Sequence, residues 1–218
     1  GDHYLINGQK TWVSRGSYAD WLFGLFRTDP ESERHRGLSF VLVPLDAEGV
    51  TVRPIEQLDG EAGFAEVFLD DVRVPVENLL GEENKGWSVA MATAGFERGL
   101  MLRSPARFQN TARKLVALYK ETLGRGESVD PVLREAVTRA WMDAEAYTLN
   151  TYQTVSRLLE GGKIGAEASL NKIFWSELDV KMHETALALL GDRGHLLPEA
   201  PAAEGVGGWL DGYLFALS

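Results

Sequence analysis

The sequence contains no cysteine, and this single absence excludes several kinds of site. Disulfide frameworks, thiolate zinc sites and cysteine nucleophiles all need a residue type that the chain does not have. Histidine is also scarce: the four histidines are His3, His35, His183 and His195, and no two of them stand three or four positions apart. A histidine-based metal site is therefore not expected, and we predict no metal ligands.

Long apolar runs and an excess of positive charge are missing as well. No uninterrupted apolar stretch approaches the roughly 20 residues that a membrane-spanning helix needs, and the first residues, 1–3, lack the regions of a signal peptide. The chain carries 22 basic and 32 acidic residues, for a formal net charge of −10, whereas nucleic-acid binding favours a basic excess. These absences predict neither a membrane span nor a nucleic-acid partner.

What remains is the composition of an ordinary globular protein. The 218 residues are 44% hydrophobic and 25% charged, so the chain is long and apolar enough to bury a core without covalent cross-links. One segment departs from the acidic balance: from Glu97 to Arg125, seven basic residues accompany only two acidic ones. This local excess of positive charge is the first feature that calls for a functional explanation.

The first part of the chain, residues 1–78, has the pattern of short strands separated by turns. Asn7-Gly8 predicts a tight hairpin, because both residues accept a positive φ. Short strands at this spacing, with no helical pattern between them, predict an antiparallel barrel or sandwich. The strand candidates are 4–6, 9–14, 21–27, 38–44, 50–54 and 66–69.

From residue 79 onward alanine, leucine and arginine dominate, and three long helical runs are predicted, at about 87–123, 130–160 and 166–190. Gly99 and Pro105 are candidates to bend or break the first run. Asp130 as the N-cap and Pro131 at the first helical position mark the start of the second run. Long helices with short connections predict a helical bundle. On one face of the second run the spacing places Val137, Trp141, Ala144, Thr148, Thr151 and Val155.

The predicted fold class is therefore α+β. Residues 1–78 are expected to form a partial antiparallel β-barrel or sandwich domain. Residues 79–218 are expected to form a C-terminal α-helical bundle.

Several short motifs also occur in one order along nearly the whole chain. Each is weak alone, but their number and order make a specific signal, and together they resemble the middle and C-terminal domains of the acyl-CoA dehydrogenase family. The motifs are Asn7-Gly8-x-Lys10-x-Trp12-x-Ser14, Asp70-Asp71-Val72-Arg73-Val74-Pro75, Gly86-Trp87, Phe96-Glu97-Arg98 and Leu190-Gly191-x-x-Gly194.

The resemblance implies a flavoprotein oxidoreductase of fatty acid and lipid metabolism, as in β-oxidation, which binds FAD and desaturates an acyl-CoA substrate between its α and β carbons. It implies an electron-transfer flavoprotein or similar acceptor and a homo- or heteromeric dimer or tetramer. The expected location is the cytoplasm, or the mitochondrial matrix in a eukaryote. The family's N-terminal helical domain and closing segment have no counterpart in these residues, so the chain is expected to be a fragment of a longer enzyme.

Trp12 and Ser14 are the first candidates for cofactor binding. At positions i and i+2 of a strand their side chains point to one face, so an aromatic ring and a hydroxyl can meet one planar ligand. The resemblance implies that Trp12 packs against the flavin ring and that Ser14 forms a hydrogen bond near flavin N5. The alternative is a half-buried tryptophan on a barrel strand with a polar neighbour.

Glu97 is the candidate catalytic base. In some family members the base lies on the first long helix of the C-terminal domain, directly before an arginine, and Phe96-Glu97-Arg98 matches that pattern. Phe96 and Arg98 are then expected to bind the substrate. The alternative is an exposed helical glutamate that pairs with a nearby basic residue.

Lys120 and Gly191 are further candidates for flavin binding. Lys120 roughly occupies the place of a family arginine that contacts the neighbouring subunit's flavin phosphates, although the usual Arg-x-x-Phe-Gly motif is not intact. Gly191 belongs to a glycine turn that either approaches the partner's flavin or caps a helix. For Arg103, Arg107 and Arg113 we expect a solvated helix face.

Two other functions stay open alongside the dehydrogenase. The chain can be a non-catalytic assembly subunit of a heteromeric acyl-CoA dehydrogenase, which the altered motif near Lys120 suggests. It can also be a flavin-dependent oxidase of the same fold.

Overall fold

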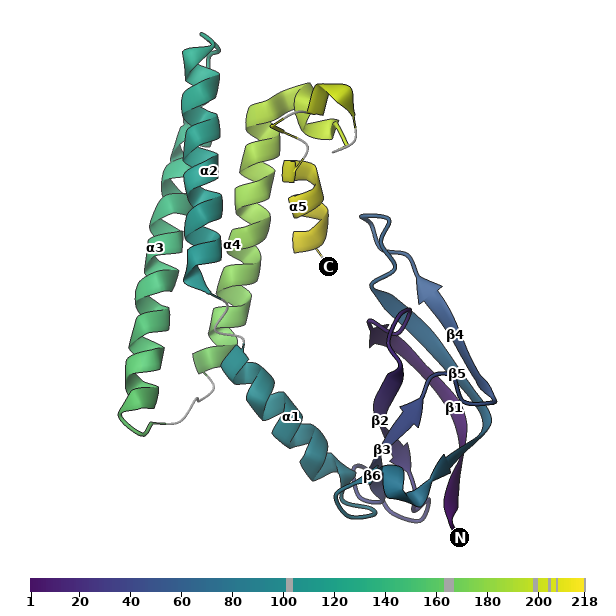
Figure 1. Ribbon diagram of the computed structural model, residues 1–218. Helices are drawn as coiled ribbons and strands as arrows, with labels where there is room; N and C mark the ends of the chain where they lie inside the picture. The colour runs from purple at the N-terminus through teal and green to yellow at the C-terminus, as the bar shows by residue number, and fades with distance from the viewer. Residues whose placement is uncertain (101–103, 163–166, 198–199, 204, 207, 218) are drawn as a thin grey trace. The chain divides into compact units, whose positions relative to one another are not determined.

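The computed structural model describes residues 1–100, 104–162, 167–197, 200–203, 205–206 and 208–217, without the side chains of 96–100 and 167–169. The chain divides into two compact units, Gly1–Phe96 and Glu97–Ser218, and each is considered by itself. The first unit holds the antiparallel sheets and the first turns of α1 (Gly86–Leu100), and the second unit is helical, as the α+β prediction requires (Figure 1). No helix in the described part of the chain is long and apolar enough to cross a membrane.

The first unit consists of two three-stranded antiparallel sheets. One has the order β1-β5-β4 and the other the order β2-β3-β6, and no ladder joins β1 to β2 among the described strands, so the barrel is not closed. The strands are β1 (His3–Ser14), β2 (Trp21–Arg27), β3 (Leu38–Pro44), β4 (Val50–Ile55), β5 (Phe64–Pro75) and β6 (Leu79–Leu80).

One apolar core joins the two sheets of the first unit. Val67 and Val72 of β5 are fully buried, and so is Val43 of β3 in the other sheet. Valine is common in strands because its branched Cβ packs well on a pleated surface. Because the buried residues of both sheets form a single cluster, the unit is a two-layer sandwich.

The predicted hairpin at Asn7-Gly8 is wrong, because β1 runs through both residues as one strand. Pairing with β5 shifts register between Ile6 and Gly8, which marks a β-bulge, and Gly8 has a φ of 145°. The Asn7 amide donates to Asp71 Oδ1 at 2.8 Å, and Asn7 Oδ1 accepts from the Asp71 backbone N–H at 2.9 Å. These cross-strand bonds replace the local turn that the dipeptide favours.

The helices follow the sandwich in sequence, and α2, α3 and α4 run alternately up and down in the bundle (Figure 1). The single run predicted over 87–123 is two helices, because Pro105 occupies the first position of α2, where a missing N–H is tolerated. The helices are α1 (Gly86–Leu100), α2 (Pro105–Gly124), α3 (Pro131–Leu159), α4 (Glu167–Leu190) and α5 (Gly208–Ala216). Among the described residues, the 3₁₀ turn η1 (Val76–Asn78) lies between β5 and β6, and η2 (Gly191–His195) and η3 (Pro201–Ala203) lie between α4 and α5.

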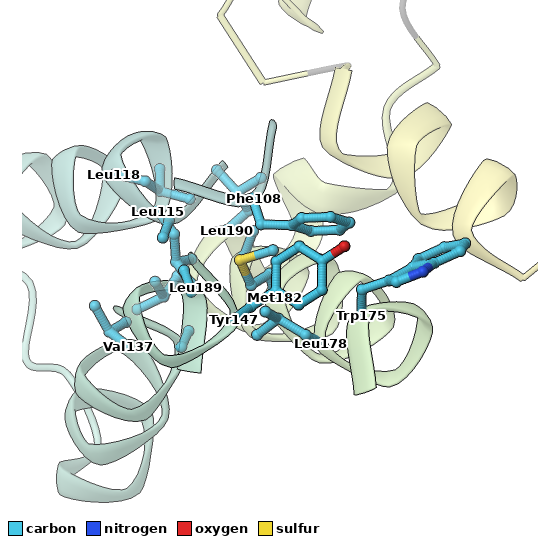
Figure 2. Close-up of a cluster of buried hydrophobic side chains, with 14 of the residues drawn as sticks. Phe108, Leu115, Leu118, Val137, Tyr147, Trp175, Leu178, Met182, Leu189 and Leu190 are labelled. Carbon is cyan, nitrogen blue, oxygen red and sulfur yellow. The ribbon is translucent and has the colours of Figure 1, made fainter. Parts of the chain in front are cut away.

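Aromatic side chains fill the centre of the bundle core (Figure 2). Phe108 of α2 meets Tyr147 of α3 edge to face, with ring centroids 5.1 Å apart. Tyr147 is buried, whereas Trp141 and Val155, predicted on the buried face of α3, are 38% and 39% exposed. Val137, Ala144, Thr148 and Thr151 are buried as predicted, so the buried face of α3 is the predicted one turned slightly to include Tyr147.

An ion pair lies beside this core. Arg107 of α2 donates from Nη2 to Asp179 Oδ2 of α4 at 2.6 Å, and the Asp179 side chain is only 3% exposed. The guanidinium also lies over the Phe215 ring of α5, 5.4 Å from its centroid. The expectation of a solvated face is therefore wrong for Arg107, whereas Arg113 is exposed and Arg103 lies outside the described residues.

Candidate functional site

The bulge that precedes the end of β1 shapes the candidate cofactor site. Lys10 pairs with Val67 but Val13 pairs with Ala65, so β1 has one extra residue between them. Trp12 within this bulge has a φ of 56°, a left-handed conformation that is rare for a bulky residue. Strained backbone of this kind costs about 1–3 kcal/mol and is concentrated at functional sites.

The bulge leaves the Trp12 ring 63% exposed. The Trp12 and Phe64 rings meet at 84° with centroids 5.8 Å apart, and most of the Trp12 side chain stays accessible to a ligand. A pocket of about 300 Å³ lies there, between β1 and β2, and Trp12 and Ser14 both line it, together with Trp21 and Phe23 of β2. The structure thus brings the two sequence-predicted residues of β1 into one pocket.

Lys10 lines the same pocket from its inner side. Its Nζ donates to the backbone oxygen of Leu25 at 2.7 Å and lies 4.7 Å from the centroid of the Phe26 ring. Burial of the side chain removes water from the ammonium group and lowers the pKa of Lys10 below its usual value.

This lowered pKa predicts a pH-dependent stability difference between the wild type and Lys10→Met. The folded state gives up the Lys10 proton at a lower pH than the unfolded state. The burial cost of the charged form is therefore fully present below the folded pKa and is relieved as pH rises towards the unfolded value. Relative to Lys10→Met, the wild type should gain stability between neutral pH and about pH 10.5. Urea unfolding of both proteins across that range measures it; a constant difference would contradict it.

The donor set of this pocket fits the ring end of a flavin. The exposed Trp12 side chain offers an aromatic ring for stacking, and the exposed Ser14 hydroxyl can donate a hydrogen bond to a ring nitrogen or oxygen. A volume of 300 Å³ is at the lower end of the range for ligand pockets, which suits one planar ring system better than a whole dinucleotide. Hydrogen-bond donors or basic side chains outside this pocket would be needed to bind the phosphates of a dinucleotide.

The other predicted site residues lie on helices and turns. Phe96, Glu97 and Arg98 belong to α1 by their backbone, and their side chains lie outside the described residues. Lys120 is exposed on α2, and Gly191 starts η2 with a φ of 55° and open space where a Cβ would be. Both lie at the end of the bundle where α2 and α4 finish (Figure 1).

Sequence reasoning missed Lys10, Trp21 and Phe23 as pocket residues. Trp21 and Phe23 alternate with buried Leu22 on β2, so period-two spacing could have placed both on one exposed face. Lys10 is part of the motif Asn7-Gly8-x-Lys10-x-Trp12-x-Ser14, but nothing in the sequence predicts its hydrogen bond to a residue of β2.

Comparisons with known proteins cover almost the whole chain. A family model described as "Acyl-CoA dehydrogenase, middle domain" matches residues 1–72. A second, described as "Acyl-CoA dehydrogenase, C-terminal domain", matches residues 84–206.

Curated relatives give the same picture. Acyl-CoA dehydrogenase IpdE1 of Mycobacterium tuberculosis is 37% identical over 218 residues, which cover 99% of this chain and 54% of that protein. Acyl-CoA dehydrogenase FadE26 of the same organism is 33% identical over 212 residues, 93% of this chain and 52% of that protein. The chain thus spans about half the length of the curated relatives it matches.

Two solved structures are similar over the full chain. The Tcur3481-Tcur3483 steroid ACAD superimposes with a TM-score of 0.87 at 28% identity, covering 100% of this chain and 56% of that one. The ChsE4-ChsE5 complex from Mycobacterium tuberculosis has a TM-score of 0.81 at 30% identity, covering 100% of this chain and 56% of that one.

Proposed function

The chain belongs to the acyl-CoA dehydrogenase family, and from this premise we propose that it forms the flavin-facing middle β-domain (residues 1–78) and C-terminal helical domain (79–218) of an FAD-dependent acyl-CoA dehydrogenase. The observation that carries the proposal is the strained, exposed Trp12 beside Ser14 in one pocket. In this proposal Trp12 stacks on the flavin ring and the Ser14 hydroxyl donates to it.

The chemistry of the reaction assigns the remaining roles. Bound FAD supplies the acceptor for the hydride that leaves the β carbon of the acyl chain. Glu97 accepts the proton from the α carbon, which is weakly acidic because it adjoins the thioester carbonyl. Arg98 and Phe96 hold the acyl-CoA, and Lys120 and Gly191 contact the cofactor bound in a neighbouring subunit.

Anaerobic titration of the full-length FAD-bound protein with acyl-CoA substrates tests the activity. We expect the flavin absorbance to bleach on addition of a substrate and to recover when an electron-transfer flavoprotein or a dye accepts the electrons. Consumption of oxygen at the same rate as dye reduction would instead identify an oxidase. A full-length protein that binds FAD but is not reduced by any acyl-CoA would reject the proposed activity.

The names of two similar structures support the alternative that this chain is an assembly subunit of a heteromeric acyl-CoA dehydrogenase. Two of the similar structures are named for pairs of proteins, ChsE4-ChsE5 and Tcur3481-Tcur3483, and the latter is called a steroid ACAD. If this chain belongs to such a pair, the protein purified alone should be colourless and should gain FAD when a second subunit of the same fold is added. A steroid-like acyl-CoA is then the first substrate to test.

The role of Trp12 predicts a large loss of cofactor affinity in Trp12→Ala. Loss of a stacked aromatic ring and of its buried area should weaken FAD binding by about 10- to 100-fold. Titration of the FAD-free, full-length protein with FAD measures the dissociation constant. Trp12→Phe, which keeps an aromatic face, is the matched control and should lose much less. Equal FAD affinity in wild type and Trp12→Ala would remove Trp12 from the site.

A further inference from the structure

Lys10 crosses the open seam between the two sheets of the first unit. β1 and β2 belong to different sheets, and no ladder joins them among the described strands. The bond from Lys10 Nζ to the Leu25 backbone oxygen, 2.7 Å long, spans this seam directly. Hydrogen bonds from a charged donor are stronger than neutral ones, so this single bond is a substantial tether.

The sequence of β2 leaves a passage for the Lys10 side chain. Gly24 precedes Leu25, and a Cβ at Gly24 would lie 3.6 Å from Lys10 Cε and 3.2 Å from the Phe26 ring. The lysine stem therefore runs past a residue without a side chain and ends above the Phe26 ring. This packing constrains the methylene groups of the Lys10 side chain as well as its ammonium group.

The tether acts on the residues that line the candidate flavin pocket. Lys10 is the last paired residue before the bulge that contains Trp12. On the other side of the bulge, Val13 pairs with Ala65, and the Arg15 N–H donates to the Gly63 oxygen at 2.8 Å. The left-handed conformation of Trp12 persists only because both flanks are held.

We propose that Lys10 is a positioning residue for the flavin pocket: anchored on the Leu25 carbonyl, it sets the spacing of β1 from β2 and so orients the Trp12 ring and the Ser14 hydroxyl. The proposal rests on the proposed function, because it assumes that the ring of FAD occupies this pocket. It assigns Lys10 no contact with the reacting atoms.

The test compares Lys10→Met with a matched control, Lys85→Met, in the full-length protein. Methionine keeps an apolar stem and removes the donor, whereas Lys85 is exposed in the same unit and pairs with Glu82 instead. We expect Lys10→Met to bind FAD about tenfold more weakly, because binding must then order the pocket walls that the Lys10 bond already orders in the wild type. The quenching of flavin fluorescence by the stacked tryptophan should also decrease. Lys85→Met should match the wild type in both measurements.

A purely structural role for Lys10 predicts a different result. In that case Lys10→Met lowers the unfolding midpoint but keeps wild-type FAD affinity and quenching in the folded protein, and the proposal is wrong. Gly24→Ala is a second variant that keeps the ammonium, but its Cβ would lie 3.2 Å from the Phe26 ring over which the ammonium sits. Gly24→Ala should weaken FAD binding several-fold. If Lys10→Met does not fold, Gly24→Ala decides the question: unchanged FAD binding and unchanged quenching in that variant would overturn the proposal.

Trp12→Ala separates this inference from the proposed function. If Trp12→Ala weakens FAD binding and Lys10→Met does not, only the role of Lys10 fails. If neither variant changes FAD binding or flavin fluorescence, the pocket is not the flavin site.

Discussion

Replacement of Arg107 by leucine is expected to lower the free energy of unfolding by about 3–5 kcal/mol, because it leaves the Asp179 carboxylate buried without a cation. The Asp179 side chain is 3% exposed, and its Oδ1 accepts no hydrogen bond from the described residues. The only nearby ring nitrogen described is His183 Nδ1, which is 3.6 Å from Oδ1 and already bonds to the Asp179 backbone oxygen at 2.8 Å. Urea unfolding of the full-length protein, followed by circular dichroism, measures the loss.

Two variants isolate the cause of that loss. Arg107→Leu combined with Asp179→Leu removes both charges and should recover most of the stability, since a buried pair is often replaceable by apolar residues. Arg113→Leu changes an exposed arginine of the same helix and should shift stability by only about 0.5 kcal/mol or less. A loss in Arg107→Leu no larger than in Arg113→Leu would show that the ion pair does not carry the stability.

Replacement of Glu97 by glutamine is expected to reduce turnover by about 100- to 10,000-fold while FAD stays bound, since general base catalysis contributes rates of this size. Glutamine has nearly the same shape but cannot accept the α proton at neutral pH. Rapid-mixing measurement of flavin reduction by saturating acyl-CoA, with the full-length protein, gives the rate of the chemical step. FAD content is measured in the same samples, so loss of cofactor is distinguished from loss of the base.

Glu121→Gln is the matched control for Glu97→Gln. Glu121 is an exposed helical glutamate that pairs with Arg125 at 2.7 Å, the arrangement that the alternative reading gives to Glu97. It should retain wild-type turnover. Near-normal turnover in Glu97→Gln would assign the base to a different carboxylate.

Local signals in the sequence were sufficient for the fold class and for several element boundaries. Asp130 caps α3 as predicted, accepting from the Val132 N–H at 2.8 Å, because a cap depends on adjacent residues only. The hairpin prediction failed at Asn7-Gly8, where cross-strand bonds to Asp71 replace the turn. Turn propensity contains no information on a partner 64 positions away.

The errors in the helical part have the same origin. Spacing along α3 defines several overlapping apolar faces, and aromatic residues of other helices, Phe108 of α2 and Phe174 of α4, select the face that contains Tyr147. Arg107 was expected in solvent because an arginine on a helix usually is. Its buried partner, Asp179, lies 72 positions away and is not visible from the periodicity of α2.

The candidate site was only partly predictable for the same reason. The motif placed Trp12 and Ser14 on one strand, and both line one pocket. The bulge that turns Trp12 outward depends on how β1 registers with β5, and the contribution of Lys10 depends on the packing of β1 against β2. Register and packing between sheets are properties of the folded chain, which alternation within one strand does not specify.

The open seam has a mechanical consequence for the pocket. Trp12 belongs to one sheet and Trp21 to the other, and within each sheet the ladder hydrogen bonds make the strands stiff. No ladder among the described strands joins β1 to β2, so backbone pairing does not fix the distance between these two side chains. The distance between these two aromatic walls therefore depends on how the two sheets pack and on the Lys10 bond, not on backbone pairing among the described strands.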